Sequence, residues 1–315
     1  MFKYTAKEIN KIADKTNFNK NTCEKVLRLF SILNFINNSE IANMVALKGG
    51  TAINLFLLDL PRLSVDIDLD FILPLAKESM LSYRKQIDYL IRNFMKKDGY
   101  HLSDKSKFVH TLDSYVYSYS TTSSSNDILK IEINYSNRVH ILKPSIKKST
   151  NILTETCSFS ILDDNELIGS KINALLVRTT PRDVYDVYNF IKNNMILDKI
   201  LVKKIAIFYA CLGSNIPINF DDIINKAIEK IQNLNYQKIK ETLITVLHKG
   251  IKFDVVEVTT NVSAFIKEIF VLDANDIEFI NNINSKSYNP NILFKGYQIE
   301  NISNHPMALW KIGNK

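Results

Sequence analysis

Residues 64–71 read SVDIDLDF, so apolar and acidic side chains alternate strictly after the opening serine. This period of two predicts a β-strand, in which successive side chains point to opposite faces. Asp66, Asp68 and Asp70 therefore share one face of the predicted strand. Carboxylates in a row repel one another, and a divalent cation such as Mg²⁺, which prefers oxygen ligands, would relieve that repulsion. The alternative is an edge strand whose acidic face protects it from aggregation.

A glycine pair, Gly49 and Gly50, followed by Thr51, lies between a short apolar run and a predicted helix over residues 52–60. Glycines there allow the backbone to approach a phosphate, and the helix N-terminus offers N–H donors and a positive dipole end. The Thr51 hydroxyl is predicted to cap the helix and to face the phosphate. A turn with left-handed dihedral angles explains the glycines equally well. The acidic strand that follows favours the phosphate site.

A third block, residues 171–186, contains three cations and two acids. Lys171 and Arg178 lie seven residues apart on one predicted helix, and Arg182, Asp183 and Asp186 open the next one. The two acids are three residues apart, so they share a helix face. A helix hairpin held by ion pairs is the alternative, but the block holds more charges than such a hairpin needs.

These blocks resemble the AbiEii/AbiGii-type toxin family, which includes the MenT toxins and belongs to the nucleotidyltransferases with the DNA polymerase β fold. The stretches LKGGTA (47–52) and RLSVDID (62–68) are similar to the family's glycine–Ser/Thr and Asp-x-Asp signature. Residues 171–186 match its Lys-x-x-Ala-Leu, Arg and Arg-Asp-x-x-Asp block. Fourteen residues separate Thr51 from Asp66, a spacing somewhat longer than is common in the superfamily.

The resemblance implies a role for each matched residue. The catalytic residues would be Asp66, Asp68 and Asp186, with either Asp183 or Asp186 as the catalytic acid of the third block. The metal ligands, for Mg²⁺ or Mn²⁺, would be Asp66, Asp68 and Glu132. The nucleotide would be bound by Gly49, Gly50, Thr51, Lys171 and Arg182, with Lys48, Arg62, Ser64, Asp70, Arg178 and Asp183 in support. Glu132 could equally be an ordinary solvent-facing residue beside Lys130.

The expected fold is α+β. A polymerase-β-type nucleotidyltransferase domain over residues 1–160, with a mixed sheet flanked by helices, would precede a mostly helical domain over residues 161–315. The helical domain would contribute lysine and aspartate residues to the active site. Further helices are predicted over residues 20–36 and 77–97, and further strands over 108–112, 114–120, 128–135 and 157–161. Tyr115, Tyr117 and Tyr119 could stack on bases or pack on a sheet face.

Composition narrows the class of protein. The chain has 315 residues and a net charge of +7, which is compatible with a polyanionic partner such as RNA. No apolar run approaches the roughly 20 residues that span a bilayer, and the first residues lack the features of a signal peptide. The sequence therefore predicts a cytoplasmic protein without a membrane partner.

The sequence thus predicts a metal-dependent nucleotidyltransferase that transfers a nucleoside monophosphate from a nucleoside triphosphate to an acceptor. The resemblance implies the toxin of a bacterial toxin–antitoxin or abortive-infection system, with tRNA as the acceptor and a cognate antitoxin as partner. Two alternatives remain. One is transfer to a protein or a small molecule such as an aminoglycoside, and the other is a catalytically idle nucleotide-binding module.

Overall fold

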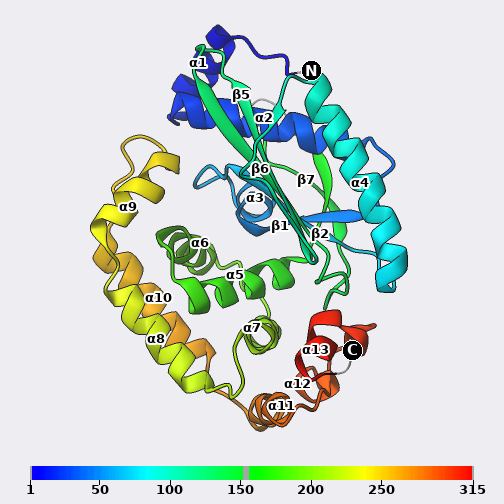
Figure 1. Cartoon of the computed structure of the whole chain (residues 1–315). Coiled ribbons are helices and arrows are strands. Elements are labelled where there is room, and N and C mark those ends of the chain that lie inside the picture. Colours follow the sequence, from blue (N-terminus) through cyan, green and yellow to red (C-terminus); the bar gives the residue numbers. More distant parts are fainter. Residues whose placement is uncertain (1, 152–155, 314–315) are drawn as a thin grey trace. The chain divides into compact units, whose positions relative to one another are not determined.

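The alternating stretch forms strand β2 (Asp66–Phe71) in the computed structural model, which describes residues 2–151 and 156–313. The other strands are β1 (Val45–Lys48), β3 (His101–Leu102), β4 (Lys107–Val109), β5 (Leu112–Ser120), β6 (Asn126–Asn134), β7 (Ser145–Lys148) and β8 (Ser158–Ile161). They form one sheet of order β3-β5-β6-β2-β1-β8-β7, with β4 paired to β5 (Figure 1). Because β2 has a neighbour on each side, the edge-strand explanation of its acidic face is wrong.

The sheet is mixed. Strand β2 runs antiparallel to β1 and parallel to β6, and β1 runs parallel to β8. The apolar side of β2 is buried, with Ile67, Leu69 and Phe71 all fully shielded from solvent. Burial of these side chains fixes which face of the strand points outward, since a slip of one residue would bury the acids. The predicted α+β class is confirmed.

Four helical segments belong to the same unit as the sheet. They are α1 (Ala6–Thr16), α2 (Lys20–Asn37), α3 (Gly49–Ala52), which continues as a π-helical turn over Ile53–Leu57, and α4 (Lys77–Lys97). A capping box between Thr5 and Glu8 starts α1, and the Asn19 side chain caps α2. The helix predicted over residues 52–60 is displaced, since it begins at Gly49 and its helical turns end at Leu57.

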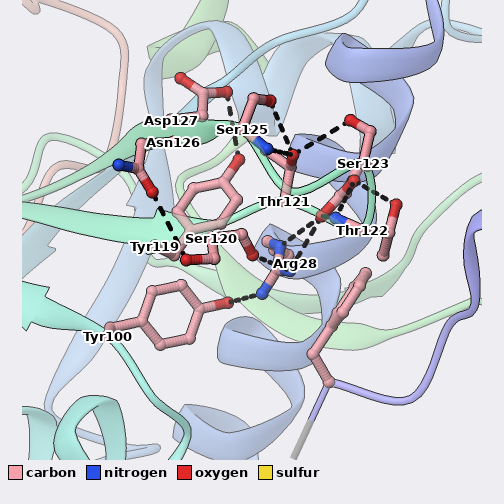
Figure 2. A network of polar contacts seen from close by, with 12 residues as sticks. Arg28, Tyr100, Tyr119, Ser120, Thr121, Thr122, Ser123, Ser125, Asn126 and Asp127 are labelled. Atoms are coloured by element: carbon pink, nitrogen blue, oxygen red, sulfur yellow. Dashed lines mark hydrogen bonds and ion pairs between the residues drawn. The ribbon is translucent and has the colours of Figure 1, made fainter.

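Helix α2 is tied to the hairpin that carries β6. The Glu24 carboxylate accepts hydrogen bonds from the Thr122 backbone N–H at 3.1 Å and from its hydroxyl at 2.8 Å. The Arg28 guanidinium donates to Glu24 and to the Ser120 carbonyl, and lies 4.2 Å from the centre of the Tyr119 ring (Figure 2). Both charges are buried and paired, so the hairpin is held firmly against α2.

The tyrosines of β5 take the packing role rather than the stacking one. Tyr115, Tyr117 and Tyr119 are at most 3 % exposed. The Tyr115 ring stacks on Tyr117, and the Tyr100 ring packs edge-on against Tyr117 and Tyr119. Side chains so deeply buried cannot stack on the bases of a nucleic acid.

A second compact unit is helical. Its helices are α5 (Asp164–Arg178), α6 (Pro181–Lys192), α7 (Lys199–Gly213), α8 (Phe220–Gln232), α9 (Tyr236–Thr242), α10 (Val255–Ile269), α11 (Ala274–Asn284), α12 (Pro290–Leu293) and α13 (Pro306–Lys311). Side-chain caps from Asp163, Thr180 and Asp198 begin α5, α6 and α7. No helix in the described part of the chain is long and apolar enough to cross a membrane.

Each unit contains one short segment whose neighbours in the sequence belong to the other unit. The sheet unit includes residues 245–250, and the helical unit includes residues 139–143 as well as residues 163–244 and the chain from residue 251 onward. The division into a nucleotidyltransferase domain at 1–160 and a helical domain at 161–315 that completes its active site stays a prediction.

Candidate active site

The acidic face of β2 is divided into two parts. Asp66 and Asp68 are partly exposed, whereas Asp70 is buried at 2 % exposure. The Asp70 carboxylate lies 2.5 Å from the Lys48 ammonium group, on the end of β1. Asp70, whose role the sequence left open, is therefore a buried partner of Lys48. Asp66 and Asp68 are the carboxylates of this row that solvent reaches.

The glycine pair lies directly against this row. Gly49 has φ +69°, a left-handed conformation that favours glycine, and a Cβ atom there would overlap the Asp68 carboxylate. A Cβ atom on Gly50 would lie 2.8 Å from Arg62 Nη2 and 3.0 Å from Ser64 Oγ. The structure thus brings together the predicted glycine turn, the Arg-Leu-Ser stretch and the second aspartate. The glycines are needed for this close approach.

Thr51 has a different local role from the predicted cap. It lies inside the helical turn, fully buried, and its hydroxyl donates a hydrogen bond to the backbone carbonyl of Asp66. The position of the N-cap belongs to Lys48, which makes no side-chain capping bond. The prediction of Thr51 as the helix cap is therefore wrong, because the helix already starts at the glycines. Thr51 instead anchors the turn to β2, while Asn54 donates to the Gly50 carbonyl at 2.9 Å.

Strand β6 adds a second charged row beside the first. In the parallel pairing, Lys130 lies opposite Asp66, and Glu132 lies opposite Asp68. The Lys130 ammonium group is 2.8 Å from the Glu132 carboxylate. Burial opposes the charge of Lys130, but its hydrogen bond to Glu132 and the carboxylates of Glu132, Asp66 and Asp68 raise its pKa above the ordinary value.

The donor set of this face suits a hard divalent cation, because Mg²⁺ takes one or two carboxylates and leaves its other positions to water and phosphate oxygens. Within residues 2–151 and 156–313, no three carboxylate, imidazole or thiol groups are gathered as a ready metal cluster. Asp66 and Asp68 fit a cation whose remaining coordination positions are filled by oxygens of the substrate. Glu132 forms an ion pair with Lys130.

The third predicted block forms a buried charge cluster on α5 and α6. Lys171, at 6 % exposure, places its ammonium group 3.1 Å from Asp183 and 3.0 Å from Asp186. Both carboxylates are fully buried. Pro181 begins α6, and Asp183 and Asp186, three residues apart on this helix, both face Lys171.

Asp183 accepts hydrogen bonds from several side chains. Arg178 donates to its two oxygens at 2.7 and 2.8 Å, and the Thr180 hydroxyl donates at 2.6 Å. Burial favours its neutral form, yet these hydrogen bonds and the charges of Lys171 and Arg178 hold the pKa of Asp183 well below its usual range. The half-buried Arg182 donates to the Thr242 carbonyl at 2.7 Å.

The family model for the AbiEii nucleotidyl transferase toxin of type IV toxin–antitoxin systems matches residues 32–257, well over half of the chain. The chain belongs to this family. The matched range contains the glycine turn, both charged rows and the α5–α6 cluster. Membership of the AbiEii family implies a nucleoside triphosphate as substrate and an antitoxin as partner. None of the curated proteins matches the sequence.

The fold of this AbiEii chain is similar to that of a solved toxin. The structure of MenT4, a nucleotidyltransferase toxin from Mycobacterium tuberculosis H37Rv, superimposes with a TM-score of 0.64 over 88 % of this chain and 94 % of that one. The two sequences are 11 % identical, so the likeness extends to the fold alone.

Sequence reasoning missed one buried cluster of the AbiEii chain. Glu166 of α5 is fully buried and accepts hydrogen bonds from the Leu142 backbone N–H at 2.8 Å and the Tyr209 hydroxyl at 2.5 Å. Its carboxylate is 3.0 Å from His140 Nδ1. Burial raises the pKa of Glu166, but His140, Tyr209 and the Leu142 N–H together hold it below the ordinary value. The cluster binds residues 139–143 to the helical unit, a long-range contact that no local pattern signals.

Proposed function

We propose that this AbiEii toxin is a metal-dependent enzyme that transfers a nucleoside monophosphate from a nucleoside triphosphate to RNA, with tRNA as the acceptor. One observation carries the proposal: the glycine turn is packed against the carboxylate of Asp68. A phosphate-binding turn and a cation-binding carboxylate in contact are what a nucleotide with its cation requires.

Asp66 and Asp68 would hold the Mg²⁺ or Mn²⁺ ions, and Glu132 is the candidate third ligand. When bound, the cation would supply a Lewis acid that lowers the pKa of the attacking hydroxyl and stabilises the leaving pyrophosphate. The apolar side of β2 is buried in the core, so both aspartates project from a rigid strand. Side chains on a rigid strand can hold the reacting groups in a precise position.

The backbone N–H groups of the turn at Gly49, Gly50 and Thr51 would bind the triphosphate, with Lys171 neutralising its charge and Arg182 in support. Asp186 would orient the acceptor and take its proton. Asp183, which accepts hydrogen bonds from Arg178, Lys171 and Thr180, is the alternative for this role. This proposal requires that α5 and α6 reach the nucleotide bound on the sheet unit.

In the proposed reaction an acceptor hydroxyl attacks the α-phosphorus. A new P–O bond forms to the acceptor while the bond between the α-phosphorus and its bridging oxygen breaks. Pyrophosphate leaves, and the hydroxyl proton passes to Asp186. The nucleoside monophosphate is thereby transferred, and the γ-phosphoryl group leaves as part of pyrophosphate.

An RNA acceptor is supported by the net charge of +7. The proposed acceptor is consistent with the cytoplasmic location that the sequence predicts. A protein or small-molecule acceptor would not require this charge. Salt dependence separates the cases, because binding to RNA phosphates weakens steeply as salt is raised.

The test is incubation of the full chain with each α-labelled nucleoside triphosphate, Mg²⁺ and total tRNA. Label on tRNA with the wild type, and its loss in Asp68→Asn, is the expected result. The control is Asp222→Asn, which removes an exposed carboxylate from α8 that pairs with Lys226. Equal labelling by Asp68→Asn would refute the site. Label on protein would refute the acceptor, and bound nucleotide without turnover would indicate an idle module.

A further inference from the structure

Acidic and basic side chains lie together on the polar side of β1, β2 and β6. Four carboxylates lie on this face, at Asp66, Asp68, Asp70 and Glu132, and two lysines lie among them. Lys48 neutralises the buried Asp70, and Lys130 pairs with Glu132. The Lys130–Glu132 pair thus lies beside Asp66 and Asp68, the carboxylates that would hold the cation.

The two lysines differ in the kind of acid they pair with. The Lys48 partner, Asp70, is buried at 2 % exposure, so solvent does not reach its carboxylate. The Lys130–Glu132 pair is open to solvent, with 42 % and 27 % of the two side chains exposed. An exposed pair of this kind is weak, so another cation can displace it.

The register places the Lys130 ammonium group where a cation would otherwise be attracted. Lys130 stands directly opposite Asp66, and Glu132 directly opposite Asp68, on adjacent strands. Asp66 and Asp68 as well as Glu132 contribute to the electrostatic field at Lys130. A positive charge in this position repels a divalent cation and also engages the carboxylate that could become its third ligand.

We propose that Lys130 is a resident counter-ion of this face, which competes with the divalent cation for Glu132 and lowers the cation affinity of the nucleotide-free protein. This inference rests on the proposed metal-dependent function and deepens it. A site of lowered affinity stays largely free of cation until a nucleotide brings further phosphate ligands. The lysine thus couples metal loading to substrate binding.

The experiment is a titration of the full chain with Mn²⁺ in the absence of nucleotide, at low ionic strength, with free Mn²⁺ followed by electron paramagnetic resonance. Lys130→Gln removes the charge and is expected to tighten Mn²⁺ binding by about tenfold, the effect that one charge within 4–6 Å has on a neighbouring equilibrium. Lys130→Arg keeps the charge and should bind Mn²⁺ as the wild type does. Lys130→Met tests the same loss of charge with a different side chain, in case the glutamine variant folds poorly.

The matched control is Lys25→Gln. Lys25 of α2 pairs with Asp127 at the start of β6, at 3.3 Å, so the variant removes the same charge from the same unit away from the acidic row. Its Mn²⁺ affinity should stay within twofold of the wild type. If Lys130→Gln and Lys130→Met bind Mn²⁺ no more tightly than Lys25→Gln, the counter-ion role is refuted.

A further variant separates this inference from the proposed function. Asp68→Asn, made alone and together with Lys130→Gln, should abolish the tight Mn²⁺ binding in both backgrounds. Binding that persists without Asp68 would refute the metal site and with it the proposed function. Binding that depends on Asp68 but is unaffected by Lys130 would refute the counter-ion alone.

Discussion

The acidic face of the sheet and the charge cluster of α5–α6 use the same residue types in opposite ways. On β2, Asp66 and Asp68 are partly exposed, and Glu132 lies opposite Asp68 on the neighbouring strand. On α5 and α6, Lys171 lies between two fully buried carboxylates, and Arg178 covers Asp183 as well. Buried charges that pair with one another are costly to separate, whereas carboxylates that solvent reaches can take a cation.

This contrast changes how variants should be interpreted. A buried ion pair costs much to break, because the remaining partner is left charged and desolvated. An exposed carboxylate in a repelling row costs little to remove. Loss of activity therefore identifies a site residue on β2, but on α5–α6 it must be separated from loss of folding.

The largest expected effect is on the stability of the helical unit. Asp183→Asn removes the negative charge that neutralises Lys171 and Arg178, so we expect the free energy of unfolding to fall by about 3–5 kcal/mol. Urea denaturation followed by circular dichroism measures it. A loss below 1 kcal/mol would show that the cluster is not the structural anchor that its burial indicates.

The second effect falls on activity and leaves stability nearly unchanged. Asp66→Asn should lower the rate of nucleotidyl transfer by about 10²–10³-fold, a loss typical of removing one electrostatic group from an active site. Because Asp66 is partly exposed, its free energy of unfolding should change by less than about 1 kcal/mol. If Asp66→Asn were both inactive and strongly destabilised, Asp66 would be needed for folding as Asp183 is, and the predicted difference between the two residues would be wrong.

The third effect concerns the contact between the turn and the acidic row. Gly49→Ala places a side chain at φ +69° and against the Asp68 carboxylate. Gly99→Ala is the control, since it places a side chain at φ +81° with no atom nearby. Each substitution should lower the free energy of unfolding by about 1–2 kcal/mol, because alanine is strained in a left-handed conformation. Gly49→Ala should lower it further, because its Cβ atom overlaps the Asp68 carboxylate. Only Gly49→Ala should also reduce activity, by up to about 100-fold, because Asp68 is displaced. Equal losses in both variants, measured by denaturation and by transfer assays, would contradict the close packing.

Local patterns predicted the elements whose periodicity is long or strict. The alternation of residues 64–71 predicts β2, and the helix expected over residues 77–97 has the bounds of α4. Strand β7 was not predicted, because Ser145–Lys148 has a single apolar residue and depends on pairing with β8. The helix start at Gly49 was missed because glycine is a poor helix former, and here tertiary contacts decide.

The charge pairs of the candidate site were beyond sequence reasoning for a different reason. The sequence indicated that Asp66, Asp68 and Asp70 share a face, but their partners depend on how strands are ordered and registered. That Lys48 meets Asp70, and that Glu132 lies beside Asp68, follows from pairings of β2 with β1 and β6. The roles of these residues in binding and catalysis stay predictions.

The smallest effect is a difference in pH dependence between the two regions. Asp183 has its pKa depressed in the folded state, so it contributes stability that is present above its unfolded pKa of about 3.9 and is lost as the pH falls below it. The wild type should therefore lose up to about 1.4 kcal/mol per pH unit from this group between pH 4 and pH 2. Asp183→Asn should lack that part of the slope, and Asp66→Asn should retain it. Urea denaturation at a series of pH values measures how the free energy of unfolding changes with pH. Equal slopes for the wild type and Asp183→Asn would show that the pKa of Asp183 is not lower in the folded state than in the unfolded chain.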